Sequence, residues 1–93
     1  MEANFEDHNY YNQRAKGEVL ADLRKHAGYN NGKLFAKEKL LMAPNQYMRY
    51  EAGGNPTDKS TLKILWCHQL GGAEFASLIE QKIIQIKTKP LNN

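Results

Sequence analysis

The stretch GGNPTDKSTLKILWCHQLG, residues 53–71, decides the fold class of this chain. Asn55 followed by Pro56 is a typical helix start, because Asn caps the free backbone N–H groups and Pro suits the first helical position. Asp58 adds a negative charge to the first turn, where the helix dipole favours it. Gly71 is a typical helix stop. The sequence therefore predicts an all-α fold, a compact bundle of four or five short helices.

A strand is the alternative for the same stretch. Leu62, Ile64 and Trp66 alternate with other residues as they do along a strand. A β-hairpin formed by about 46–52 and 60–69 would give an α+β fold, with helices packed on that hairpin. If the stretch is a helix, apolar residues surround most of its circumference, so we expect it to be buried on most sides.

Two longer helices flank this stretch. Residues 73–87 form the clearest one, because their aliphatic and aromatic side chains recur at helical spacing, namely Phe75, Ile79, Ile83 and Ile86. Residues 11–27 also carry one apolar arc, and Gly28 is a natural stop for that helix. Gly17 within it indicates either a close contact or a later helix start.

The central segments are less regular. Residues 33–42 suggest a helix that places Leu34, Phe35, Leu41 and Met42 on one side. Glu38 falls within that arc, and we expect its carboxylate to reach the rim, because an unpaired buried charge is costly. Residues 44–52 fit either a short helix or a strand.

Composition indicates one small globular domain over residues 1–93, with loose ends at about 1–9 and 88–93. The chain has 93 residues, of which 41% are hydrophobic and 25% charged, and no apolar run approaches the roughly 20 residues of a membrane helix. Cys67 is the one cysteine, so no internal disulfide can form. We therefore expect a cytoplasmic protein without a membrane association.

No catalytic, metal-binding or cofactor-binding pattern is present in the sequence. His8, His26, His68 and Cys67 do not stand at the spacings of known zinc motifs. Cys67 and His68 are neighbours in the chain, which is not the geometry of a nucleophile with its base. The sequence therefore predicts a protein that is not an enzyme and needs no cofactor.

Positive charge is unevenly distributed. Residues 14–39 contain seven basic and three acidic residues, whereas residues 1–13 contain three acidic and no basic ones. Tyr and Phe side chains are interleaved with these lysines and arginines, a mixture that suits phosphate contact and base stacking. Direct nucleic-acid or nucleotide binding through the basic stretch 14–50 is therefore the alternative function.

Protein binding is the function that we favour from the sequence. Tyrosine and arginine are enriched where partners contact each other most strongly, and a small domain without catalytic residues acts by occupying a surface. The predicted partner-binding residues are Tyr29, Lys33, Lys37, Tyr47, Arg49 and Tyr50. We predict an inhibitor or adaptor of a larger protein; a phage or mobile-element inhibitor of host nucleic-acid machinery fits the chain's size. Self-association stays open.

Overall fold

The computed structural model describes residues 5–88, and these are helical almost throughout. Among them are five α-helices and one π-helical segment, and no strand. In chain order the elements are α1 (Phe5–His26), α2 (Gly32–Phe35), η1 (Ala36–Leu40), α3 (Pro44–Glu51), α4 (Asp58–His68) and α5 (Gly72–Thr88). The predicted all-α fold is confirmed, and the hairpin alternative is wrong because both of its segments are helices.

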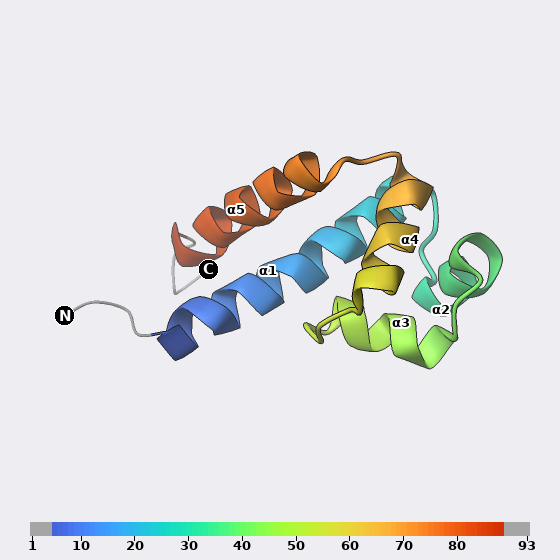
Figure 1. Cartoon of the computed structure of the whole chain (residues 1–93), viewed down its shortest axis with the longest axis horizontal. Helices are drawn as coiled ribbons and strands as arrows, with labels where there is room; N and C mark the ends of the chain where they lie inside the picture. Colours follow the sequence, from blue (N-terminus) through green and yellow to red (C-terminus); the bar gives the residue numbers. More distant parts are fainter. Residues whose placement is uncertain (1–4, 89–93) are drawn as a thin grey trace.

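The long helix α1 packs against α5, α3 and α2, and α4 packs on η1 (Figure 1). Helix α5 runs back along α1 in the opposite direction, so the beginning of α1 and the end of α5 lie together. There the ammonium group of Lys87 lies 5.1 Å from the ring centre of Tyr11. The short elements α2, η1, α3 and α4 gather around the other end of α1 (Figure 1).

Gly17 allows α1 and α3 to approach each other closely. A Cβ atom at Gly17 would overlap the carbonyl oxygen of Glu51 and would lie 2.9 Å from the carbonyl carbon. The expectation of a close contact at this glycine is therefore confirmed, and the helix does not start late. Helix α1 in fact begins at Phe5, before the expected residue 11, so residues 5–9 of the predicted loose end are helical. Residues 1–4 and 89–93 of the predicted loose ends lie outside the described part.

An ion pair also connects α1 and α3. Arg24 Nε and Nη2 donate to the two carboxylate oxygens of Glu51 at 2.7 and 3.0 Å, and both side chains are only 7% exposed. Arg24 Nη1 also donates to the carbonyl oxygen of Tyr29 at 2.8 Å. This bidentate arrangement compensates both buried charges, which would otherwise be costly to remove from water.

Phe35 lies at the centre of the core. Its ring is fully buried and contacts the rings of Tyr29, Tyr47 and His68, with centroid distances of 5.3, 5.7 and 5.4 Å. The remaining buried apolar residues come from α1, η1, α3, α4 and α5 and form one cluster with it: Ala15, Val19, Leu20, Ala36, Leu40, Tyr47, Tyr50, Ile64, Leu65, Phe75 and Ile79.

The segment predicted as one helix over 33–42 is divided. Four residues of α2 lead directly into the π-helical segment η1, and Leu41 then takes a left-handed conformation with φ 51°. This change of winding turns Leu41 outward, whereas Phe35 and Leu40 are buried. Glu38 is exposed as expected, and its carboxylate accepts a hydrogen bond from the Tyr29 hydroxyl at 3.1 Å.

Helix α4 begins later than predicted. Thr57 is its N-terminal capping residue, since its hydroxyl accepts a hydrogen bond from the Ser60 N–H at 3.1 Å. The helix ends at His68, and Gln69 follows it in a left-handed conformation with φ 56°. Asn55 and Pro56 precede the cap. No helix among residues 5–88 is long and apolar enough to cross a membrane.

Candidate functional site

Helix α4 has one buried side and one side open to solvent. Ser60 and Ile64 are buried at a spacing of four residues, and Leu65 is buried beside them. The Tyr50 hydroxyl on α3 donates to Ser60 Oγ at 3.3 Å and accepts from Gln46 at 2.6 Å. These contacts fix the rotation of α4 about its own axis and therefore decide which residues point outward.

The outward side combines apolar and basic residues. At 100° per residue, an arc about 100° wide on the side opposite Ile64 contains Lys59, Leu62, Lys63 and Trp66. All four are exposed; Trp66 is 86% exposed and Leu62 is 68% exposed. This result corrects the expectation that α4 is buried on most sides. The short neighbouring elements cover only about half of its circumference.

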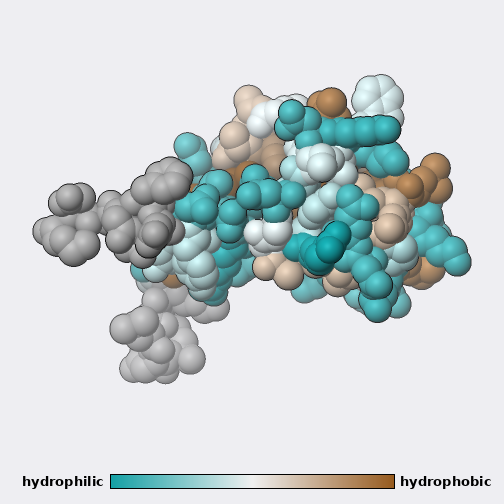
Figure 2. All heavy atoms as spheres, turned by 60° about the horizontal axis from the view of Figure 1, so that its bottom comes forward, coloured by the Kyte–Doolittle hydropathy of each residue, from teal (hydrophilic) through white to brown (hydrophobic). Residues whose placement is uncertain are grey.

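Leu41 extends this surface beyond α4. It is 78% exposed, and it lines the same shallow hollow as Lys59 and Lys63. We call the surface formed by Leu41, Lys59, Leu62, Lys63 and Trp66 the α4 face. In Figure 2, apolar atoms (brown) lie at the surface among polar atoms (teal) on the side remote from the grey ends, the side on which α2, α3 and α4 lie in Figure 1.

A second hollow adjoins Trp66 at the end of α4. It has a volume of about 440 Å³ and is lined by Leu65, Trp66, Gln69 and Leu70. Its walls are mostly apolar, and the left-handed Gln69 at its edge supplies an amide. A single large apolar side chain from another molecule could lie in it. We call it the Trp66 hollow.

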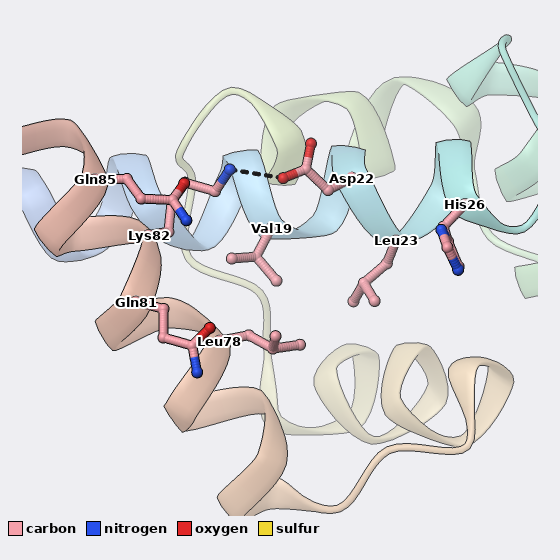
Figure 3. A pocket seen from close by; sticks show the side chains of 8 residues that line it. All are labelled: Val19, Asp22, Leu23, His26, Leu78, Gln81, Lys82 and Gln85. Carbon is pink, nitrogen blue, oxygen red and sulfur yellow. Dashed lines mark hydrogen bonds and ion pairs between the residues drawn. The ribbon is translucent and has the colours of Figure 1, made fainter. Parts of the chain in front are cut away.

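A third hollow lies between α1 and α5 (Figure 3). It measures about 230 Å³, and its apolar side is formed by Val19, Leu23 and Leu78, whose side chains point toward one another. At its edge the Lys82 ammonium group donates to Asp22 at 2.7 Å, which ties the two helices together across the groove. Because Asp22 and Lys82 are already paired with each other, we interpret this hollow as part of the packing between α1 and α5.

The tyrosines predicted as contacts lie largely in the interior. Tyr47 is fully buried and Tyr50 is 6% exposed, so both are core residues and their expected exposure is wrong. Burial, and next the neighbouring Glu51 carboxylate, raise the pKa of Tyr47. The hydrogen bond with Ser60 is the main cause that lowers the pKa of Tyr50. The Tyr50 hydroxyl is thus engaged by Ser60 and Gln46, whereas the Tyr47 hydroxyl is buried without a hydrogen-bond partner among the described residues.

The other predicted contacts are more accessible. Lys33 on α2, Lys37 on η1 and Arg49 on α3 are exposed, as expected for contact residues. Tyr29 is half-buried, and its ring packs edge-on against Phe35. The structure thus leaves the three cations available and places the aromatic residues expected beside them in or against the core.

The α4 face is not among the contact residues predicted from the sequence. Leu62 and Trp66 belong to a stretch that was expected to be a helix buried on most sides. One signal in the sequence pointed to this surface: the apolar residues of the stretch occupy more of the helix circumference than a few short neighbouring segments can cover. Some of them therefore had to remain outside, although periodicity alone could not show which.

The neighbouring Cys67 and His68 do not form a reactive pair. The pKa of the Cys67 thiol is raised by burial, and that of His68 is lowered by burial. His68 Nε2 is buried and finds no hydrogen-bond partner within residues 5–88, and its ring stacks on Phe35. Across the described residues, no three His, Cys, Asp or Glu side chains lie close enough together to hold a metal ion.

The fold and the face together define an all-α helical chain with an exposed apolar and basic surface on one helix. Comparisons with protein-family models, with curated proteins and with solved structures found no match for it.

Proposed function

We propose that this chain is a non-catalytic binding protein of the inhibitor or adaptor type, which acts by covering part of a larger protein with its α4 face. One observation carries the proposal. Trp66, the one tryptophan of the chain, is 86% exposed and stands one helical turn from Leu62, which is 68% exposed.

The free energy of folding does not explain these two residues. Their side chains contribute little to packing because most of their surface stays in water, and a charged residue would serve an exposed helix position equally well. Covering an apolar side chain of this size with a partner stabilises a complex by about 1.5–3 kcal/mol. Tryptophan is also among the residues most enriched at the energetic centres of protein interfaces.

Leu41 supports the same interpretation. A residue other than glycine in the left-handed region costs about 1–2 kcal/mol, and Leu41 also leaves a large apolar side chain in solvent. Glycine would remove both costs. The left-handed conformation ends η1, where the Leu41 N–H donates to the Ala36 carbonyl oxygen, but this role needs no leucine side chain. A local cost of this kind is typical of positions that serve function.

Direct nucleic-acid binding through the basic stretch 14–50 is the second candidate. The exposed cations Lys33, Lys37 and Arg49 favour it. The burial of Tyr47 and Tyr50 removes two of the aromatic rings that base stacking would have used. Protein binding is therefore the stronger proposal.

The test is affinity capture from a lysate of the source cells with three immobilised proteins. These are the unaltered chain, the double variant Leu62→Ala/Trp66→Ala, and the control Ile84→Ala. Ile84 is 61% exposed and lies in the last part of α5. The end of α5 lies away from α4 (Figure 1). Each capture is performed with and without nuclease, and far-ultraviolet circular dichroism verifies the fold of each variant.

We expect one protein to be retained by the unaltered chain and by Ile84→Ala after nuclease treatment, and to be lost from the double variant. Equal capture by all three proteins would contradict the α4 face as the contact. Partners that disappear with nuclease, or nucleic acid alone in every eluate, would favour the basic stretch.

A further inference from the structure

The positive charge of the molecule lies around the α4 face. Residues 32–68, which form α2 to α4 and their connections, contain six basic and three acidic residues. Helices α1 and α5 together contain six of each. The net charge of +3 therefore belongs to the part of the chain that carries the α4 face.

The acidic residues of that part are largely engaged or remote from the face. Glu51 is paired with Arg24 in the interior, and Glu38 accepts the hydrogen bond of Tyr29. On α4 itself the only acidic residue is Asp58, in the first turn. Lys59 and Lys63 have no ion-pair partner among the described residues, so their charges face solvent uncompensated.

Exposed apolar side chains are concentrated in the same part. Of the six large ones on the described surface, Tyr10 lies on α1 and Ile84 on α5, and residues 32–68 contain the others, namely Leu34, Leu41, Leu62 and Trp66. A surface that is apolar and positively charged together is complementary to one that is apolar and negatively charged.

We propose, on the basis that the α4 face is the contact, that its partner is a protein segment with carboxylate groups beside a large apolar side chain. The apolar side chain occupies the Trp66 hollow. Lys63 and Lys59 precede Trp66 by three and seven residues, which corresponds to about 5 and 10 Å along the helix. The partner's carboxylates therefore lie about 5–10 Å along the helix from Trp66, which is at the edge of the hollow that holds its apolar side chain.

A second copy of this chain is a poor occupant. A twofold dimer would place the same face of each copy against the other, so Lys59 and Lys63 would meet their own equivalents. Like charges brought together in this way disfavour association. Nucleic acid fits less well because Trp66 is the one aromatic ring of the α4 face, and Leu41 and Leu62 offer no further ring on which successive bases could stack.

The test is selection from a library of random 12-residue peptides displayed on phage, with the unaltered chain as bait and Leu62→Ala/Trp66→Ala for counter-selection. We expect the retained peptides to be enriched in Asp and Glu close to Phe, Trp or Leu. For the best such peptide, Lys59→Glu/Lys63→Glu should weaken binding about tenfold. Lys87→Glu, a reversal at the far end of α5, should change it less than twofold.

Trp66 fluorescence then compares an acidic selected peptide with oligothymidylate and with vesicles of anionic phospholipid. We expect a shift of the emission to shorter wavelength with the peptide only. Selected peptides without acidic enrichment, or a shift with only the oligonucleotide or the vesicles, would overturn the proposed partner chemistry. Failure to recover any peptide that depends on Leu62 and Trp66 would instead contradict the proposed function itself.

Discussion

Replacement of Gly17 by alanine tests the contact between α1 and α3 on which the fold depends. In an open helix, glycine to alanine stabilises by about 1 kcal/mol, because alanine has the better helix propensity. At Gly17 the new Cβ would overlap the Glu51 carbonyl oxygen and lie 3.0 Å from the Gly53 nitrogen. Both are backbone atoms, so the helices themselves must separate.

The size of the loss follows from two contributions. Overpacking of an interior contact costs about 1–3 kcal/mol. Displacement of Glu51 also strains its bidentate pair with Arg24, in which each side chain is 7% exposed. Overpacking near the upper end of this range, plus the strain on the ion pair and minus the propensity gain of about 1 kcal/mol, should lower the free energy of unfolding of Gly17→Ala by about 2 kcal/mol.

The assay is urea unfolding followed by circular dichroism, with Gly72→Ala as the matched control. A Cβ at Gly72, in the first turn of α5, would meet nothing within 4 Å, so that variant should be neutral or stabilised by up to about 1 kcal/mol. With a slope near 1–2 kcal/mol per molar urea, the midpoint of Gly17→Ala should fall by about 1–2 M. A Gly17→Ala protein as stable as Gly72→Ala would refute the close packing of α1 on α3.

Three further predictions concern single residues. Arg24→Met should lower the free energy of unfolding by about 3–5 kcal/mol, because it leaves Glu51 charged and buried without a partner. The double variant Arg24→Met/Glu51→Leu should recover much of that loss in urea unfolding. Equal losses in the single and double variants would refute the coupling of the two residues. Leu41→Gly should raise the melting temperature yet weaken partner binding, and a lower melting temperature would contradict a strained, exposed Leu41. Because burial lowers the pKa of His68 below its ordinary 6.5, the unfolded chain binds the proton more readily, so stability should fall as the pH drops below about 6.5. A pH titration of the melting temperature should show a smaller fall in His68→Phe, and an equal fall would exclude His68 as the cause.

Local signals in the sequence were sufficient for the fold class. The stripe of Phe75 and Ile79 identified α5, and Gly28, which has φ 95° in the structure, marked the end of α1 correctly. Gly17 indicated a close contact before its partner was known. These features depend on neighbours in the chain, so a single sequence contains them.

Tertiary contacts decided what the sequence could not. Asn55 and Thr57 are both residue types that cap helices, so capping preference alone does not show that Thr57 is the capping residue of α4. The pair of Arg24 and Glu51 joins residues 27 positions apart, and no spacing rule indicates it. The burial of Tyr47, likewise, follows from the position of Phe35 beside it.

The candidate site was the least predictable feature for the same reason. Leu62, Ile64 and Trp66 are all apolar, so the sequence does not distinguish them. The contact between Ser60 and Tyr50 fixes the rotation of α4, and this rotation points Leu62 and Trp66 toward solvent and Ile64 toward the core. Tyr47 and Tyr50 were predicted as contact residues, yet both are buried, because exposed and core tyrosines look alike in a sequence.

The most direct test of the α4 face uses Trp66 as a reporter. Because the chain contains one tryptophan, incorporation of 5-fluorotryptophan gives a single ¹⁹F resonance that belongs to Trp66. The difference in its chemical shift between H₂O and D₂O measures the contact of the ring with solvent. We expect that difference to be large in the free chain and to disappear when the captured partner binds. A complex in which the resonance keeps its free position and its full solvent sensitivity would contradict the α4 face as the binding surface.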